Sequence, residues 1–195
     1  DSLVQALLLR QTDNDRYGSI TKSFARPDFA EQGQLHSTPF EEGLYGTSEM
    51  VMDGFMHLRK AGILRRTVED RGQAIYCHGG FVLGSKKFYA WLRDLMGEDS
   101  SGFSMTRISK VNDLYDSDEN SLRRQRRKAR FFNTCMQVTL LGAAASETLE
   151  NGTVISGVGG QFNFVAMAHE LDQARSILML RSTTFRDGKK QSNIV

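Results

Sequence analysis

The sequence predicts an α/β fold: an open, mixed sheet with parallel portions, flanked by helices. Apolar, β-branched runs alternate along the chain with runs whose apolar residues recur at helical spacing. In addition, a glycine-rich turn at residues 156–160 separates a strand-like run from a helix-like run. With 195 residues, 39% of them hydrophobic and 25% charged, the chain can bury one sizeable core, and we expect one domain over residues 1–195.

The first third of the chain predicts a helix, a loop and a second helix. Residues 1–10 carry leucines and a valine at helical spacing, and this helix should fade near residues 17–18. Residues 18–42 mix Gly, Pro and polar residues without a period, which indicates an extended loop, either an insertion or a flap. Residues 50–61 have an apolar helical face, and Gly62 is placed to close that helix at C′.

The rest of the chain alternates the two kinds of run. In chain order we expect a strand at 74–77, a helix at 85–96, a strand at 103–108, a charged helix at 118–130, strands at 138–141 and 152–156, a short helix at 162–169 and a strand at 176–180. No internal repeat or low-complexity tract is visible.

Composition narrows the function. A net charge of +2 gives little reason to expect nucleic acid or an anionic membrane as a partner. No apolar run approaches the ~20 residues that span a bilayer, and no signal-like segment stands at the start, so we expect no membrane partner and a cytoplasmic protein. Cys77 and Cys135 form no C-x-x-C pair, and we expect both to be buried small apolar groups.

The glycine-rich turn is the strongest candidate for a site. Gly157, Gly159 and Gly160 permit positive φ and a close approach of the backbone to a ligand. A strand, a glycine loop and a helix start together present N–H donors and a positive dipole end to an anion or a developing oxyanion. The spacing matches neither a dinucleotide loop nor a P-loop, so a plain connector is an equal alternative on spacing alone.

A second segment makes the turn more specific. Residues 43–55 read GLYGTSEMVMDGF and lead into Ala61-Gly62, while the distal turn reads Gly-x-Gly-Gly-Gln-x-x-Phe. Together they resemble the C-terminal half of the acetyl-CoA hydrolase/transferase family, which includes acetate and hydroxybutyrate CoA-transferases. Residues 133–142 have the rhythm of a family strand, and the resemblance covers roughly residues 1–195. It implies the fold of the second domain of CoA-transferases.

The resemblance assigns roles to particular residues. Glu49 falls where the family has its nucleophilic glutamate, which forms an anhydride with the acyl group and then a glutamyl-CoA thioester. The backbone amides of Gly157, Gly159, Gly160 and Gln161 would contact CoA and the oxyanion. Asn133 would orient the substrate, with a strand-end cap as the equal alternative. Without the resemblance, Glu49 is a surface carboxylate near a helix N-terminus.

The same resemblance implies the reactants and partners. CoA would enter as a substrate, with no permanently bound cofactor, alongside an acyl-CoA and a small carboxylic acid. Whether the acceptor is an acid or water, and therefore whether the enzyme is a transferase or a hydrolase, stays open. The chain starts at Asp1 without Met, so we expect an excised piece, inactive alone, whose N-terminal half is a partner. A homo-oligomer is left open.

The chain also departs from the family pattern. Gln137 and Thr139 stand where many members have an acidic pair, which puts the role of that pair in doubt. Gly84 and Ser85 resemble a family loop that starts a helix. The lysines that follow, Lys86 and Lys87, are expected to face solvent rather than CoA phosphates.

No metal site is predicted. Glu49, Asp53 and His57 have the spacing of one helix face, but no second ligand cluster accompanies them. The remaining histidines, His36, His78 and His169, are isolated in the sequence.

Two alternatives of other classes stay open. One is a catalytically silent CoA-binding or assembly module in which Glu49 only caps a helix. The other is a nucleic-acid-binding module built on the six cations between Arg123 and Arg130, against which neighbouring acidic residues favour a solvated helix. No aromatic residues are interleaved with those cations to stack on bases.

Overall fold

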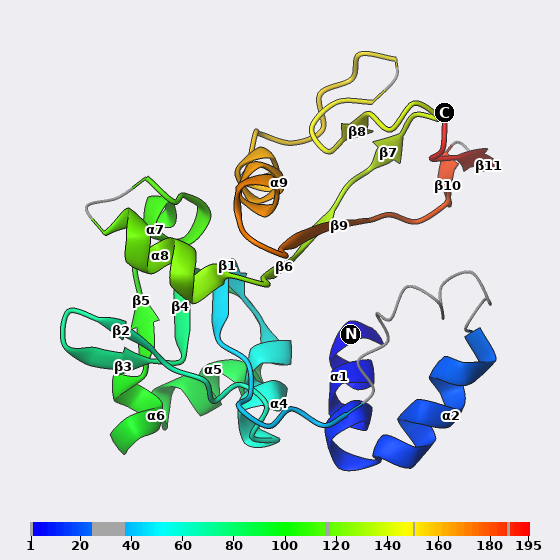
Figure 1. The fold of residues 1–195 in the computed structure, drawn as a ribbon. Helices are drawn as coiled ribbons and strands as arrows, with labels where there is room; N and C mark the ends of the chain where they lie inside the picture. Colours follow the sequence, from blue (N-terminus) through cyan, green and yellow to red (C-terminus); the bar gives the residue numbers. More distant parts are fainter. Residues whose placement is uncertain (1, 25–37, 116–117, 150, 187) are drawn as a thin grey trace. The chain divides into compact units, whose positions relative to one another are not determined.

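The computed structural model describes residues 2–24, 38–115, 118–149, 151–186 and 188–195. Their contacts divide the chain into two compact units, Asp1–Val111 and Asn112–Val195. Figure 1 shows the helices and strands along the chain, coloured from blue at the N-terminus to red at the C-terminus. Parallel strand pairs occur in both units, so the predicted mixed α/β fold is confirmed.

The first unit is built around a parallel three-stranded sheet in the order β1-β4-β5. Its elements are α1 (Ser2–Thr12), α2 (Asn14–Phe24), β1 (Gly46–Val51), α4 (Asp53–Lys60), β2 (Val68–Asp70), β3 (Gln73–Ile75), β4 (Cys77–Val82), α5 (Lys86–Arg93), α6 (Gly97–Ser101), β5 (Phe103–Met105) and α7 (Ile108–Asn112). Strands β2 and β3 form a separate antiparallel hairpin. Its turn residues, Arg71 and Gly72, both have positive φ, as a tight hairpin turn requires.

The core of the first unit lies between the sheet and helices α4 and α5. Its fully buried members come from β1, α4, β4, α5 and the connecting segments: Val51, Met56, Leu64, Tyr76, Cys77 and Phe88. Burial of such side chains stabilises a fold by about 1.5–3 kcal/mol each. Burial also raises the pKa of the Cys77 thiol to about 12, so the predicted buried, apolar character of this cysteine is confirmed.

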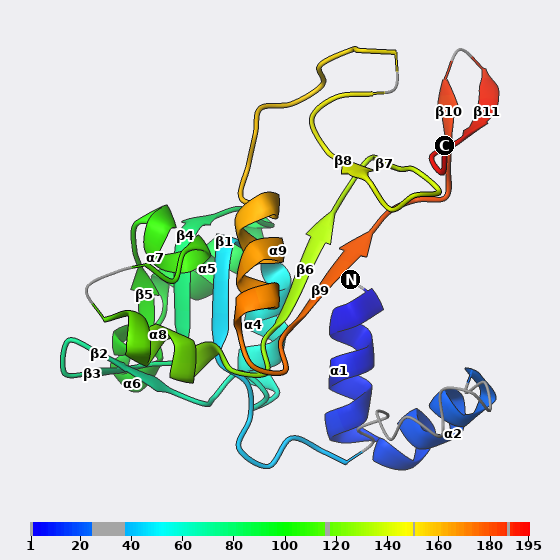
Figure 2. The ribbon, with the colours of Figure 1, turned by 45° about the horizontal axis from the view of Figure 1, so that its top comes forward.

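The second unit contains one parallel strand pair and a covering helix. Its elements are α8 (Glu119–Arg126), β6 (Arg130–Thr134), β7 (Gln137–Val138), β8 (Ala144–Ala145), α9 (Gln161–Glu170), β9 (Arg175–Met179), β10 (Thr183–Arg186) and β11 (Lys189–Ser192). Strands β6 and β9 pair in parallel, and α9 packs along them, as Figure 2 shows. Phe131 of β6 and Phe164 of α9 meet in this core with ring centroids 5.5 Å apart.

Helix boundaries follow local capping signals. Ser85 caps α5 by accepting a hydrogen bond from the amide of Phe88, and Asp118 caps α8 by accepting one from Ser121. Helix α4 ends at Lys60, and Gly62 follows with a φ of +68°, so its predicted C′ role is confirmed. The helix predicted at 118–130 ends earlier, because Lys128 has a positive φ and Arg130 belongs to β6.

Two predicted strands are wrong. Residues 152–156 are exposed and form only an isolated bridge, Thr148 with Val154, instead of a buried strand. Of residues 138–141 only Val138 is in a strand, because Gly142 turns the chain with a φ of +90° and leaves Leu141 99% exposed. In both cases the backbone bonds to a neighbour only over part of the run, 193–195 beside 138–140 and 147–149 beside 153–155, and such isolated bridges do not make a strand.

The N-terminal prediction is also corrected. A second helix, α2, occupies residues expected to begin the loop at 18–42, because the helical turn continues past Tyr17, whose amide donates to the carbonyl of Asp13. Residues 25–37 of that segment lie outside the described residues. Helix α1 packs on α4, where Val4 fills the space that a side chain at Gly54 would take. No helix among the described residues is long and apolar enough to cross a membrane.

Candidate functional site

Glu49 is the fourth residue of β1, so it does not stand at a helix N-terminus, the position expected of it without the family resemblance. It is half-buried, and its strand neighbours Ser48 and Met50 pair with Gly79 and Phe81 of β4. Helix α4 begins only at Asp53, because the chain stays extended at Met52, whose ψ is 177°. Glu49 therefore lies near the carboxyl end of a parallel strand pair, the edge at which open α/β sheets bind ligands.

Gly80 of β4 lies directly against the backbone of Glu49. A Cβ built on Gly80 would be 2.9 Å from the carbonyl oxygen of Glu49 and 3.5 Å from its Cα. It would also clash with the Cδ1 atom of Ile108 in α7. Only glycine permits this approach of the two strands, so Gly80 sets the position of the Glu49 peptide.

The loop after β4 is tied to the helix after β1. The carboxylate of Asp53 accepts hydrogen bonds from the amide of Ser85, at 3.0 Å, and from the Ser85 hydroxyl. The hydrogen bonds from Ser85 hold the pKa of Asp53 below its usual value. The predicted start of a helix at Gly84 and Ser85 is confirmed, and both lysines that follow, Lys86 and Lys87, are exposed.

The glycine-rich segment of the second unit is exposed and leads into α9. A Cβ built on Gly157 or Gly159 would meet no atom within 4 Å, and neither residue has a positive φ. Gly160 is buried and forms the N-cap of α9 with a φ of −82°. The prediction that these glycines use positive φ is wrong, because none of the three has a positive φ and the chain enters the helix through bends at residues 156 and 160. What the glycines leave is an open backbone.

The two ends of the loop at residues 147–160 meet at a neck, which Ser146 holds together. Its carbonyl accepts a hydrogen bond from the Ser156 hydroxyl at 3.3 Å, and its hydroxyl donates to the Gln161 side-chain oxygen. The amides of Ile155 and Ser156 both donate to the carbonyl of Glu147. The Gln161 side chain therefore anchors the loop. No side chain caps α9, which leaves the amides of its first turn for other acceptors.

Asn133 lies near the carboxyl end of β6, opposite Leu178 of β9, and not at the start of a strand as predicted. The strand begins earlier, at Arg130, because the parallel pairing with β9 starts there. The Nδ2 atom of Asn133 is buried without a hydrogen-bond partner among the described residues. A buried amide donor without a partner costs about 1–3 kcal/mol, which makes this atom a candidate to bind a ligand acceptor.

The predicted site residues belong to different units. Glu49 is part of the first unit, whereas Asn133, Gln161 and the glycine-rich segment are part of the second. The chain departs from the family pattern at Gln137 and Thr139. Gln137 is buried in β7, and the Thr139 hydroxyl accepts a hydrogen bond from the amide of Ala143 in the turn.

The sequence analysis missed a buried polar chain centred on His78. This histidine of β4 is 2% exposed, and its Nδ1 lies 2.7 Å from the hydroxyl of Tyr45. Its Nε2 lies 3.0 Å from the carboxylate of Asp70 in β2, which also binds the ammonium of Lys110 in α7. Burial opposes ionisation of Asp70, but the hydrogen bonds from Lys110 and His78 outweigh it and lower the pKa.

Of the other histidines, the two that the structure describes take no part in such a cluster. His57 on α4 and His169 on α9 are exposed, and His36 lies outside the described residues. Within the described parts of the chain, no group of three or more His, Cys, Asp or Glu side chains is arranged to hold a metal ion.

The cation run from Arg123 to Arg130 is largely used inside the second unit. Arg123 bridges Glu119 and Glu170, and Arg126 is 2% exposed and donates to the carbonyl of Asp113 at 2.8 Å. Arg130 donates to three backbone carbonyls, those of Lys128, Ala129 and Gln173. These roles account for half of the six cations and favour the interpretation of the run as structural.

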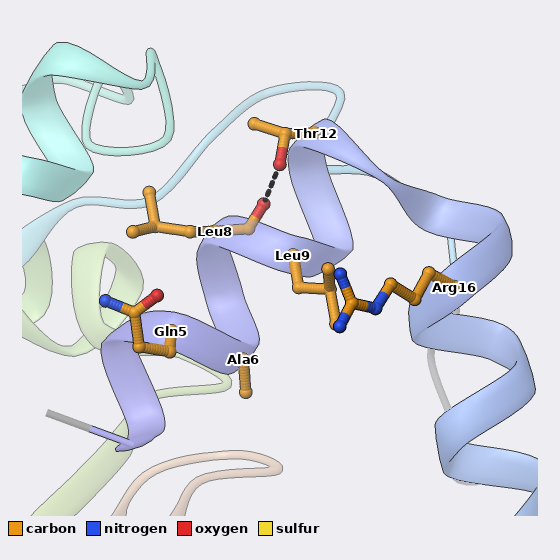
Figure 3. A pocket seen from close by; sticks show the side chains of 6 residues that line it. All are labelled: Gln5, Ala6, Leu8, Leu9, Thr12 and Arg16. Atoms are coloured by element: carbon orange, nitrogen blue, oxygen red, sulfur yellow. Dashed lines mark hydrogen bonds between the residues drawn. The ribbon is translucent and has the colours of Figure 1, made fainter.

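Two cavities in the first unit lie away from Glu49. One, of about 350 Å³, lies at the corner of α1 and α2 and is lined by Gln5, Ala6, Leu8, Leu9, Thr12 and Arg16, which Figure 3 shows. The other, of about 480 Å³, is lined by residues that include Arg59, Tyr76 and Glu98. Neither has Glu49 in its lining.

The mixed α/β fold, with parallel strand pairs flanked by helices, is the fold class that the resemblance to CoA-transferases predicted. The family model "Acetyl-CoA hydrolase/transferase C-terminal domain" matches residues 84–195, more than half of the chain. The chain belongs to this family. Glu49 precedes the matched segment.

Individual relatives agree with this assignment. The chain is 27% identical over 155 residues to the probable butyrate:acetyl-CoA coenzyme A-transferase of Syntrophomonas wolfei, covering 75% of this chain and 30% of the relative. It is 28% identical over 138 residues to the 4-hydroxybutyrate coenzyme A transferase of Clostridium kluyveri, covering 70% of this chain and 29% of the relative. The crystal structure of RipA from Yersinia pestis matches with a TM-score of 0.56 and 28% identity, over 75% of this chain and 30% of RipA. The chain thus spans about three tenths of the length of these relatives.

Proposed function

We propose that this chain carries the nucleophile of a CoA-transferase, and that Glu49 is that nucleophile. The observation that supports it is the placement of Glu49 near the carboxyl end of β1, where Gly80 brings β4 against its backbone. The substrates are an acyl-CoA and a small carboxylic acid, since two relatives are named for butyrate, acetyl-CoA and 4-hydroxybutyrate. No permanently bound cofactor is needed for this chemistry.

The proposed reaction begins with attack of the Glu49 carboxylate on the thioester carbonyl carbon. The carbon–sulfur bond breaks, CoA leaves as a thiolate, and the acyl group and Glu49 form a mixed anhydride. The thiolate then attacks the Glu49 carbonyl, which releases the first acid and leaves a glutamyl-CoA thioester. The acceptor carboxylate takes CoA by the same steps in reverse. Water reaching either intermediate would turn transfer into hydrolysis.

Each addition places negative charge on a carbonyl oxygen, which requires preorganised donors. We assign this role to the backbone amides of Gly157, Gly159, Gly160 and Gln161. Neither φ nor packing requires glycine at Gly157 or Gly159, which supports a role for the bare backbone toward a bound molecule. The buried, unpartnered Nδ2 of Asn133 supports a role in orienting the substrate. Because the relatives are about three times longer, the remaining N-terminal portion is proposed as a partner of this chain.

The test is covalent trapping on the full-length protein. After incubation with acetyl-CoA, the adduct is trapped with borohydride or hydroxylamine and mapped by peptide mass spectrometry. We expect modification of Glu49, absent in Glu49→Ala and retained in Glu42→Ala, a control on an exposed carboxylate before β1. Turnover without any adduct would overturn the nucleophile assignment and favour hydrolysis by water. If the wild type shows neither turnover nor an adduct, and CoA still binds to Glu49→Ala, a silent CoA-binding module is favoured instead.

A further inference from the structure

The buried chain of Tyr45, His78, Asp70 and Lys110 has a defined direction. Asp70, ionised and beside the Lys110 ammonium, can only accept hydrogen bonds, so Nε2 of His78 must carry a proton. The Tyr45 hydroxyl lies 2.7 Å from Nδ1 and completes the chain at the other ring nitrogen. A hydroxyl can donate to a bare Nδ1 or accept from a protonated one, so the direction of the chain is fixed at the Asp70 end.

This chain connects the elements that surround Glu49. Tyr45 immediately precedes β1, and Thr47 of β1 pairs with His78 of β4. The hydrogen bond of Tyr45 thus fixes the start of the strand that carries Glu49. Because the strand is extended, a shift at its start would also move Glu49. Through its bond to His78, Asp70 also links the end of β2 to β4.

A second connection runs through α7. Lys110, bound to Asp70, and Ile108, packed where a side chain at Gly80 would be, stand two residues apart on this helix. Gly80 in turn lies against the Glu49 backbone. Displacement of Lys110 would therefore also loosen the support behind Glu49.

We propose that Tyr45, His78, Asp70 and Lys110 are positioning residues that hold β1 and α7 around Glu49, with His78 donating from Nε2 to Asp70. The proposal rests on the proposed function of Glu49. A buried polar chain carries a desolvation cost that an apolar cluster of the same volume avoids, so stability alone is a weak reason for its presence. Placement of a reacting group is a stronger one, since a misplacement of about 1 Å can lower a rate about 100-fold.

The first measurement needs no activity. Long-range ¹H–¹⁵N NMR of the histidine rings in the 195-residue chain reports which nitrogen carries the proton. We expect a proton on Nε2 of His78 at neutral pH, kept in Tyr45→Phe because Asp70 still accepts from that nitrogen. A His78 protonated on Nδ1 alone would overturn the proposal.

The second measurement is kinetic and uses the full-length protein with acetyl-CoA. Tyr45→Phe keeps the ring and removes only the hydroxyl, and we expect kcat and the rate of Glu49 adduct formation to fall about 10- to 100-fold with little change in KM. His78→Gln keeps a donor for Asp70 but offers Tyr45 no ring nitrogen. It should likewise lower kcat with little change in KM. The double variant should be no slower than the worse single one, because one chain is broken in each. His57→Gln is the control and should keep the wild-type rate.

The outcomes separate the two proposals. If wild type forms the Glu49 adduct and folded Tyr45→Phe forms it equally fast, the positioning role fails and the proposed function stands. If wild type forms no adduct, the proposed function fails and the positioning role fails with it, whatever the tautomer of His78. Should His78→Gln not fold, the milder Tyr45→Phe decides.

Discussion

The backbone of Glu49 and the glycine at position 80 are in direct contact, with no room between them for a methyl group. We expect Gly80→Ala to destabilise the chain by about 1–3 kcal/mol, since the Glu49 backbone and Ile108 must both shift. Urea unfolding of the 195-residue chain measures this. Gly18→Ala is the matched control: this helical glycine has open space around it, so alanine should stabilise by about 0.5–1 kcal/mol. An unchanged stability for Gly80→Ala would show that the strands can separate at low cost.

The exposed glycines of the second unit should behave in the opposite way. We expect Gly159→Ala to leave the free energy of unfolding within about 0.5 kcal/mol of wild type, because its Cβ meets no atom within 4 Å. In the full-length protein kcat/KM for acetyl-CoA should nevertheless fall about 100- to 1,000-fold, if the Cβ keeps the oxyanion from its donors. Equal kcat/KM in variant and wild type would remove this loop from the proposed site.

The hydrogen bond from Ser146 to Gln161 should limit the motion of the loop between them. In Ser146→Ala the neck loses this bond, and we expect faster amide hydrogen exchange across residues 147–160. Ser182→Ala, an exposed serine of the same unit, should leave exchange in that loop unchanged. If both variants exchange alike, the neck is held by the backbone bonds to Glu147 alone.

Acid should weaken the first unit through Asp70. Its folded-state pKa lies below the ordinary value of 3.8, so its contribution is fully present above that pH and is lost as pH falls through the lowered value. Lys110→Met removes the ammonium, after which burial raises the pKa of Asp70. We expect a loss of about 1–3 kcal/mol at neutral pH and a flatter decline below about pH 4. Urea unfolding at a series of pH values tests this, with Lys60→Met, an exposed lysine of α4, as control. Parallel pH profiles for Lys110→Met and wild type would contradict it.

Arg126 should matter for folding more than its neighbour Arg124. Arg126→Met keeps the length of the buried side chain but leaves the carbonyl of Asp113 without this donor, so we expect a loss of about 1–3 kcal/mol. Arg124→Met, exposed on the same helix, should stay within about 0.5 kcal/mol of wild type by thermal or urea unfolding. Salt-dependent binding of nucleic acid that is lost in Arg124→Met would instead support the nucleic-acid alternative.

Local signals in the sequence located some of the helix ends. Ser85, Asp118 and Gly62 mark caps within three or four residues of the backbone groups they serve, and these assignments are confirmed or lie within a residue of the observed ends. The strand expected at 176–180 agrees with β9 to one residue. Such signals are readable because both partners are close in the sequence.

The strand predictions failed where a distant partner decides. Val154 and Leu141 have the composition of buried strand residues, yet they are 72% and 99% exposed, since no strand of the described chain pairs along their segments. Glu49 was expected beside a helix, whereas pairing with β4 extends β1 as far as Val51. A β-strand exists only through its neighbours, so composition alone misplaced these residues.

By itself, the sequence determined the α/β class, the helix start at Ser85, the C′ glycine at position 62, the family and the candidate residues Glu49, Asn133 and the glycine-rich segment. Only the tertiary structure decided that Gly80 backs Glu49 and that His78 joins Tyr45, 33 positions away, to Asp70, which is itself 40 positions from Lys110. Residue type and spacing report interactions within a turn of helix or a hairpin. Contacts between residues tens of positions apart depend on which strands pair and which helix covers them, and those choices are made by the packing of the whole unit.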